Sequence, residues 1–371
     1  MGALDGLVVA DFTRILAGPY CTMLLADMGA DVIKVERPGT GDETRAWGPP
    51  FDDDGRATYF EAVNRNKVSV ALDLSDPADR VRAHDLARGA DVVIENFTTG
   101  TMERFGLGWT ELSADRPGLI YCSITGFGSG AGAQLPGYDL LAQAVGGLMS
   151  VTGPDEQSPT KAGVAVTDVI TGLHAAVGIL AALHHRDHTG QGQHIEVALL
   201  TSLLSGLVNH TSAVLSGGVV PGITGNGHPS IVPYQSYDTA DRKIVVAVGT
   251  DRQFRALADV LGRPDLADDA RFVTNPDRVR HRDELNVALQ QRLSQRTAGE
   301  WLVELADAGI PAGPINTVAD AIDLAATLGL DPVHEITSPD RVTPFRTIAH
   351  PIRFSATPAR YDTPPPPAPA S

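Results

Sequence analysis

Residues 7–36, LVVADFTRILAGPYCTMLLADMGADVIKVE, indicate the fold class of this chain. Leu7–Phe12 and Asp31–Glu36 are short runs rich in β-branched residues, and an apolar helical segment begins between them at Gly18. A strand, a helix and a second strand in this order are typical of a βαβ unit, whose strands lie parallel in one sheet. The stretch therefore predicts an α/β fold.

The same alternation continues beyond this unit. The further strands that we expect are Lys67–Leu74, Asp91–Asn96, Gly118–Phe127 and Gln193–Leu199. We expect four further helices. One begins at Pro77, two cover Leu140–Met149 and Val169–Leu183, and the last ends near Leu215. The pattern predicts a Rossmann-like parallel sheet covered by helices.

A chain of 371 residues exceeds the size at which a single core stops growing, so we expect more than one domain. The Gly/Pro-rich stretch SGGVVPGITGNGHPS, residues 216–230, interrupts the pattern. We therefore assign residues 1–215 to a large α/β domain and 216–330 to a smaller α+β domain. Residues 331–371 return to the large domain and end in the proline-rich tail TPPPPAPAS, which we expect to be extended and poorly ordered.

The smaller domain has a simpler pattern. It contains an expected strand at Ile244–Gly249, helices at Asp251–Leu261, Arg282–Leu293 and Thr297–Gly309, and a turn at Pro311–Pro314.

Composition excludes several classes of partner. A net charge of −16 opposes binding to nucleic acid or to an anionic membrane, because both are negatively charged. Two cysteines, Cys21 and Cys122, give no disulfide framework and no metal-ligand spacing, so we expect a cytoplasmic protein without a metal. The N-terminus lacks a basic region before an apolar run, and no uncharged apolar run reaches about 18 residues, so we expect neither a signal peptide nor a membrane span.

A dinucleotide-binding enzyme is an alternative that the first βαβ unit raises. Glu36 ends the second strand, where such enzymes place a ribose-binding acid. The turn TRILAGP, residues 13–19, lacks the Gly-x-Gly-x-x-Gly that lets the backbone approach a pyrophosphate, which disfavours this alternative.

Basic residues gather near the expected carboxyl edge of the sheet, where α/β proteins bind ligands. They are Arg14, Lys34, Arg37, Arg45, Arg65, Lys67 and Arg104. Any one of them is more simply a surface charge, but together they predict a local binding site for a phosphate-bearing ligand.

Asp168 is the one acidic residue of the apolar run VAVTDVITGLHAAVGILAAL, residues 164–183. It precedes an expected buried helix, so it is either a helix cap or a reacting group. The positive end of the helix dipole should keep its carboxylate ionised. Asp139 also opens a helix and is more simply a cap, whereas His174 is more simply a core residue. The histidine-rich HHRDHTGQGQH, residues 184–194, lacks a suitable carboxylate ligand and is expected to be a solvated turn rather than a metal site.

Several segments in one order resemble the class III CoA-transferases, the family of formyl-CoA transferase and carnitine CoA-transferase, over almost the whole chain. They include LAGPYCTMLLADMGADVIKVERPGTGDETR, ADVVIENFTTGTMERFGLG, PGYDLLAQAVGGLMSVTG, VTDVITGLHAAVGILAAL and GIPAGPINT. ERPGTGDETRAWGPPF, GHPSIVPYQSY and TNPDRVRHRDEL look like the succinyl-CoA:glutarate CoA-transferase type, which implies dicarboxylate substrates. The resemblance implies the CoA-transferase family III fold and an interlocked homodimer.

The resemblance also implies roles for individual residues. Asp168 falls on the catalytic aspartate, which attacks an acyl-CoA and carries the acyl group and then CoA. The positions implied to bind coenzyme A are Leu16, Ala17, Arg37, Leu72, Asp73, Leu74, Ser75, Asn96, Phe97, Thr98, Arg104, Gly137, Tyr138, Asp139 and Leu140. The candidate contacts to the small carboxylic acid are Gly225, Gly227, His228 and Ser230.

Departures from the family pattern separate the alternatives. Leu16 stands where formyl-CoA transferase has a glutamine, so formyl or oxalyl specificity is not expected, and the glycine-rich loop of that enzyme has only Gly222–His228 as a counterpart. In α-methylacyl-CoA racemase a histidine acts as a base at the position of Tyr138, and a phenol is a poor base at neutral pH. A racemase and a CoA-binding protein without catalysis are thus the alternatives to a transferase.

Overall fold

A computed structural model describes residues 2–369, which form two compact units. The larger unit contains the chain up to Leu148, Lys161–Val220, and the chain from Asp331 onward. The smaller unit contains Met149–Thr160 and Pro221–Leu330. The short segment Met149–Thr160, which the sequence assigns to the large domain, thus packs with the smaller unit.

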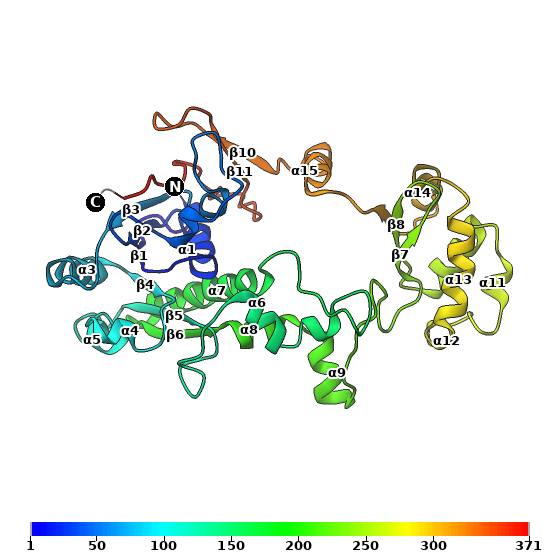
Figure 1. Ribbon diagram of the computed structural model, residues 1–371, viewed down its shortest axis with the longest axis horizontal. Helices are drawn as coiled ribbons and strands as arrows, with labels where there is room; N and C mark the ends of the chain where they lie inside the picture. Colours follow the sequence, from blue (N-terminus) through cyan, green and yellow to red (C-terminus); the bar gives the residue numbers. More distant parts are fainter. Residues whose placement is uncertain (1, 370–371) are drawn as a thin grey trace. The chain divides into compact units, whose positions relative to one another are not determined.

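The larger unit is built on a six-stranded sheet, which appears in blue to green in Figure 1. Its strands are β1 (Val8–Asp11), β2 (Asp31–Glu36), β3 (Lys67–Ala71), β4 (Val92–Glu95), β5 (Ile120–Thr125) and β6 (Gln193–Ala198). All neighbours pair in parallel in the order β3-β2-β1-β4-β5-β6. The predicted parallel α/β sheet is confirmed, and its order reverses between β1 and β4.

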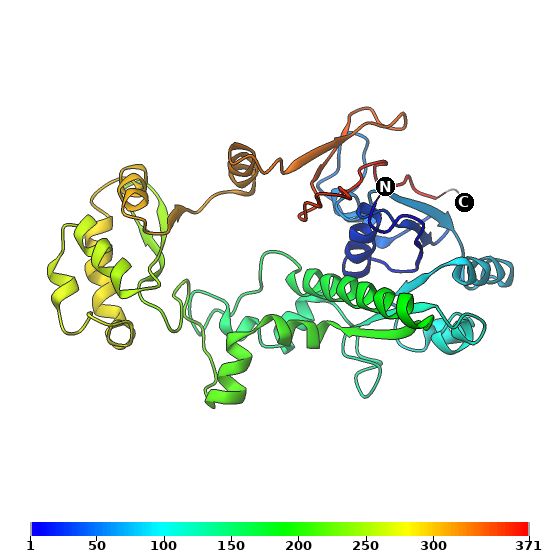
Figure 2. The ribbon, with the colours of Figure 1, turned by 180° about the vertical axis from the view of Figure 1, so that it is seen from behind.

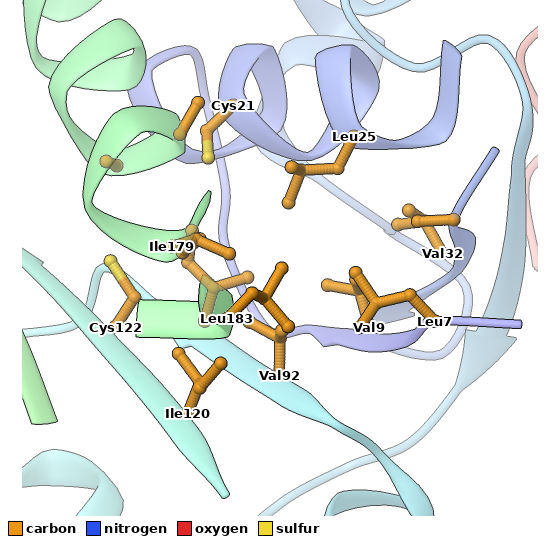
Figure 3. Packing of buried hydrophobic residues seen from close by; sticks show 14 of the residues in the cluster. Leu7, Val9, Cys21, Leu25, Val32, Val92, Ile120, Cys122, Ile179 and Leu183 are labelled. Atoms are coloured by element: carbon orange, nitrogen blue, oxygen red, sulfur yellow. The ribbon is translucent and has the colours of Figure 1, made fainter. Parts of the chain in front are cut away.

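Helices cover both faces of this sheet (Figures 1 and 2). α1 (Ala17–Asp27) and α7 (Val166–Thr189) pack on one face, and α3 (Pro77–Gly89), α4 (Thr101–Arg104) and α5 (Trp109–Asp115) on the other. Successive side chains of a strand point to opposite faces, so Val92 and Ile94 of β4 contact the first group, while Val93 contacts the second. Figure 3 shows Cys21 and Leu25 of α1 and Ile179 and Leu183 of α7 above the sheet.

α7 is the longest helix of the larger unit, with 24 residues. By length and composition alone it could cross a membrane, which corrects the expectation from the uncharged run. Its buried residues, among them Ala175, Ala176 and Ile179, pack instead in the core with α1 and the sheet. It extends to Thr189 rather than Leu183, so the expected histidine-rich turn begins as the last exposed turns of a helix.

Several short elements complete the larger unit. They are η1 (Glu43–Ala46), α2 (Thr58–Glu61), α6 (Asp139–Val145), α8 (Leu199–Gly206), α9 (Asn209–Gly217), β10 (Val333–Ile336) and β11 (Phe345–Ile348). The single helix expected up to Leu215 is wrong: α8 and α9 are separated at Val208, where φ is +38° and helical hydrogen bonding is interrupted.

The proline-rich tail is held in place, contrary to the expectation that it is poorly ordered. Arg45 donates to the carbonyl oxygens of Pro366 and Pro367 at 3.1 and 3.2 Å. Asn66 receives the backbone N–H of Thr363 on its side-chain oxygen and donates its own N–H to the Thr363 carbonyl oxygen. Polar side chains far away in sequence therefore fix the tail at least to Pro367.

The smaller unit combines an antiparallel sheet with helices around a core that includes Trp301 and Phe254. Its elements are η2 (Met149–Val151), β7 (Tyr234–Asp238), β8 (Lys243–Ala247), β9 (Ala312–Pro314), α10 (Asp251–Val260), α11 (Asp265–Asp268), α12 (Asn275–Arg280), α13 (Arg282–Leu293), α14 (Ala298–Asp307) and α15 (Val318–Thr327). The expected turn at Pro311–Pro314 is largely an edge strand, because β9 pairs with β8.

Candidate active site

The loops that follow β1 and β4 meet where the strand order reverses. Asn96 joins them: its side-chain oxygen accepts from the Arg14 N–H at 2.9 Å, and its N–H₂ donates to the Arg14 carbonyl oxygen at 2.7 Å. Reversal points of parallel sheets are the usual ligand sites of this architecture, because the diverging loops leave a crevice. A cavity of about 260 Å³ opens here. Its lining includes Leu16, Ala17, Asn96, Phe97, Thr98, Gly137, Tyr138 and Asp168.

Asp168 is the third residue of α7 and does not cap that helix. Ala165 occupies the N-cap position and provides no side-chain hydrogen bond. Instead, Oδ1 of Asp139 accepts from the N–H groups of Thr167 and Asp168 at 2.8 and 3.3 Å. The sequence leaves the cap and the reacting group equally open for Asp168; the structure gives the capping function to Asp139, which lies on another helix. Within residues 2–369, no donor contacts the Asp168 carboxylate, which therefore faces the cavity unengaged.

The pKa of Asp168 is raised from 3.8 to about 7. Partial burial is the larger cause, and the negative charge of Asp139 is the second. The expectation that this carboxylate is fully ionised is wrong at neutral pH, because desolvation and a like charge both disfavour the anion. The group is close to half ionised at pH 7 and becomes a full carboxylate above it.

Two backbone features hold the start of α7, which carries Asp168, close to the start of α1. A Cβ on Gly172, one turn after Asp168, would lie 2.5 Å from the Ala17 carbonyl oxygen, so only glycine lets α7 approach the start of α1 so closely. Ile15, in the turn before α1, has φ +71°, which is costly for a β-branched residue. Its N–H donates to Asp42 at 3.2 Å, so a buried carboxylate holds this strained turn at the cavity.

Two lysines of the predicted phosphate-binding cluster are buried in ion pairs instead. Lys34 Nζ lies 2.9 Å from Asp42, and Lys67 Nζ lies 3.3 Å from Asp11, with all four side chains fully buried. Burial lowers the pKa of Lys67 to about 8 despite the neighbouring Asp11. Neither ammonium group is available to a phosphate.

Two arginines of the cluster are also used internally. Arg45 forms a bidentate pair with Glu36 at 2.7 Å, and Arg65 pairs with Asp27 at 2.6 Å. The first pair also occupies the acid that a dinucleotide ribose would require. The prediction is therefore wrong for these four of the seven basic residues, whose acidic partners are not adjacent in sequence. Arg14 also pairs with Glu43 at 2.6 Å, but both of these side chains stay partly exposed.

Of the remaining basic residues, Arg14 and Arg37 line a second cavity of about 490 Å³ on the other side of the Asn96–Thr98 loop. Its lining includes Arg37, Leu72, Asp73, Leu74 and Ser75, and it shares Arg14, Phe97 and Thr98 with the first cavity. Arg14 stacks over the Phe97 ring at 4.7 Å. Arg104 is exposed on α4, where it donates to Thr101 of the cavity wall. The two cavities thus bring together most positions implied to bind coenzyme A.

Three of the expected ligand positions lie outside the lining of these cavities. They are Arg104, Asp139 and Leu140, of which Leu140 is 54% exposed on α6. The candidate acid-binding residues Gly225, Gly227, His228 and Ser230 belong to the smaller unit. There, His228 Nδ1 accepts from the Ser230 N–H at 3.0 Å, and Arg282 donates to the His228 carbonyl oxygen.

Sequence reasoning missed Tyr59 and Gln143. Burial raises the pKa of Tyr59, and so do the charges of Asp168 and Asp139, so this phenol is near enough to feel both carboxylates. Its ring packs edge-on against Trp47. Gln143 is fully buried and contacts Asp139. In the sequence, only the spacing of four residues between Asp139 and Gln143 on one helix could have indicated that these two side chains contact each other.

Two other kinds of reactive group contribute nothing to this site. Burial raises the pKa of both cysteine thiols, Cys21 and Cys122, and both face the core. In residues 2–369, no group of three or more His, Cys, Asp or Glu side chains is placed to hold a metal ion. The fold and the cavities define an α/β enzyme site for a long ligand, with a carboxylate at one end.

Comparison with known proteins assigns the chain more specifically. Residues 4–370 match CoA-transferase family III. The chain is 43% identical over 371 residues to the succinate–glutarate CoA-transferase of Agrobacterium fabrum, covering 98% of this chain and 92% of that one. It is 42% identical over 340 residues to the succinyl-CoA:glutarate CoA-transferase of Mus musculus, covering 91% and 78%.

A solved structure agrees. A CAIB/BAIF family protein from Brucella suis is similar with a TM-score of 0.87 and 43% identity, over 99% of this chain and 96% of that one. The chain belongs to CoA-transferase family III and is an acyl-CoA:carboxylate CoA-transferase. The family and the enzyme class expected from the sequence are thereby confirmed.

Proposed function

We propose that the enzyme transfers coenzyme A from a succinyl-CoA-like donor to a dicarboxylic acid, with Asp168 as the covalent nucleophile. The single observation that carries the proposal is the unengaged carboxylate of Asp168 in the cavity at the sheet reversal. Names of relatives that act on succinyl-CoA, succinate and glutarate support the choice of dicarboxylates.

The reaction balances without a proton donor or metal. An oxygen of Asp168 attacks the thioester carbonyl carbon, the C–S bond breaks, and a mixed anhydride forms with release of CoA thiolate. The thiolate then attacks the Asp168 carbonyl of the anhydride, which gives an aspartyl-CoA thioester and the free donor acid. The acceptor carboxylate attacks this thioester and expels the thiolate, which finally attacks the acceptor carbonyl and restores the Asp168 carboxylate.

The two cavities suit the two ends of an acyl-CoA. In this proposal the thioester lies beside Asp168, and the nucleotide part lies near Arg37 and Leu72–Ser75, where Arg37 and Arg104 are exposed cations. Each tetrahedral step produces an oxyanion that requires fixed donors. Backbone N–H groups in Gly222–Gly227, or at the start of α6, are candidates for this role. His228 and Ser230 are candidates for the second carboxylate of the acceptor.

We also propose that the working enzyme is the interlocked homodimer that the family implies. α7 leaves an apolar stripe uncovered: Leu173, Val177 and Leu180 are 41%, 65% and 37% exposed. These residues follow a helical spacing, and stripes of this kind are typically covered by another chain. Light scattering of the purified protein should give twice the chain mass, and a monomeric mass in active enzyme would contradict the dimer.

A mass-spectrometric exchange assay tests the function. Acyl-CoA donors are combined with a panel of dicarboxylates, and hydroxylamine is added to trap the acylated enzyme as a hydroxamate at Asp168. Asp168→Ala should abolish exchange while CoA binding persists. Exchange by this variant, or a trapped adduct on another residue, would refute the mechanism.

Mass spectrometry of the same acyl-CoA substrates also distinguishes a transferase from the alternative racemase. A racemase exchanges the α-proton of a branched acyl-CoA without an acceptor acid. Deuterium incorporation at that carbon in the absence of acceptor would favour a racemase; we expect none.

A further inference from the structure

Gln143 is a fully buried polar side chain whose hydrogen-bonding groups are both used. Its N–H₂ donates to Oδ2 of Asp139 at 2.6 Å and lies 3.4 Å from the Val164 carbonyl oxygen. Its oxygen accepts from the Ala162 N–H at 2.8 Å. A buried amide with satisfied donors and acceptors can rigidify its surroundings.

These contacts lead directly to the reacting residue. The second oxygen of Asp139 accepts from the Thr167 and Asp168 N–H groups, so Gln143 and Asp139 together hold residues 162–168 at four backbone positions. Ala162 lies immediately after the point where the chain returns from the smaller unit, at Lys161. The start of α7 is therefore fixed by α6, because α7 has no cap of its own.

We propose that Gln143 is a positioning residue for the transferase reaction: it orients the Asp139 carboxylate and anchors residues 162–164, and thereby sets the attack position of Asp168. The proposal rests on the proposed function, in which Asp168 is the nucleophile. A displacement of about 1 Å at a reacting group can cost roughly 100-fold in rate, so such an anchor is kinetically significant.

The contact with Asp139 also has an electrostatic consequence. The charge of Asp139 is one of the two causes that raise the pKa of Asp168. Loss of the Gln143 donor would leave the negative charge of Asp139 less compensated. Asp168 would then ionise at higher pH, and the pH dependence of turnover would follow.

Two substitutions test the donor and the acceptor of the Gln143 side chain. Gln143→Met is similar in volume but neither donates nor accepts strongly, so kcat should fall roughly 100-fold, with the KM for acyl-CoA within twofold and the acid limb of kcat moved to higher pH. Gln143→Glu keeps an oxygen for the Ala162 N–H but replaces the amide donor with a second acid beside Asp139, where two carboxylates cannot both ionise, so it should also lose most of kcat. The second variant serves as well if the first does not fold.

Thr171→Val is a matched control on the same helix. Thr171 is fully buried and donates to the Thr167 carbonyl oxygen at 2.7 Å, so this isosteric change removes one buried hydrogen bond near Asp168 without touching Asp139. It should lower the melting temperature while leaving the acid limb in place. Equal effects of Thr171→Val and Gln143→Met on the acid limb and kcat would overturn the proposal.

Hydroxylamine trapping in the wild-type enzyme distinguishes an error in the role of Gln143 from an error in the proposed function. Hydroxylamine trapping at Asp168 in wild type, with the same trapping rate in both Gln143 variants, would overturn the role of Gln143 alone. Absence of any Asp168 adduct in wild type would overturn the covalent mechanism and the positioning role with it. Trapping in wild type that slows in both variants but not in Thr171→Val is the expected result.

Discussion

Replacing Asp168 with asparagine should inactivate the enzyme and stabilise its fold above neutral pH. The carboxyl has a pKa of about 7 in the folded chain and an ordinary value of 3.8. One pH unit corresponds to about 1.4 kcal/mol, so ionised Asp168 destabilises the fold by up to about 4 kcal/mol. The side chain is partly exposed, and solvent screening reduces this to about 2–4 kcal/mol.

The sign follows from proton binding. The folded state binds the Asp168 proton more tightly than the unfolded state, so this contribution to stability is complete below about pH 4 and is lost as the pH rises toward 7. Asparagine has nearly the same shape and no charge. The variant should therefore match wild type near pH 4 and exceed it above pH 7, with less than half of the full difference at pH 5.

Thermal unfolding of the ligand-free enzyme at pH 5 and pH 8 measures the effect. For a unit of this size, about 2 °C of Tm corresponds to 1 kcal/mol, so Asp168→Asn should raise Tm by roughly 4–8 °C at pH 8. Asp187→Asn, at an exposed position of the same helix, is the control and should change Tm by less than about 1 °C. An equal gain at both pH values, or none at pH 8, would refute the electrostatic reasoning.

Three further outcomes are expected. In wild type, kcat should rise with pH through about 7 as Asp168 ionises; a pH–rate profile without a limb in this range would contradict that assignment. Arg37→Ala should raise the KM for acyl-CoA several-fold with little change in kcat, as steady-state kinetics would show, because Arg37 lines the second cavity away from the reacting end. Arg65→Met should lower the free energy of unfolding by about 3 kcal/mol in urea titration, because it leaves Asp27 buried without its cation; a loss below 1 kcal/mol would count against this pair.

The sequence predicts the elements of the larger unit well because buried parallel strands and their covering helices have distinct patterns. β2 and α3 begin at the expected residues, and the wrong predictions concern tertiary effects. α8 ends at Gly206, just before the break at Val208, but a single glycine inside a helical pattern is tolerated and does not predict a break. The strand β9 exists through pairing with β8, which no local pattern reveals.

The site was partly predictable for a related reason. Asp168 is conspicuous in sequence because it is a single charge beside an apolar run, whereas the basic cluster is misleading because charge alone does not show what a side chain contacts. Lys67 and Asp11 are 56 positions apart yet share one buried pair. The cations that line the second cavity could be identified only after the internal pairs were known.

The placement of Asp139 resolves an apparent conflict in the chemistry of Asp168. A carboxylate of ordinary pKa is a weak nucleophile and a much better leaving group than a thiolate, so an anhydride would revert readily to thioester. Burial and the Asp139 charge raise the basicity of Asp168 and bring it closer to that of CoA thiolate, which balances the forward and reverse steps of an exchange reaction. Asp139 can exert this effect without blocking the carboxylate because it contacts the backbone N–H of Asp168 rather than its side chain. In the proposed mechanism the same residue therefore positions the nucleophile and strengthens it, and the proposed role of Gln143 is to hold that residue in place.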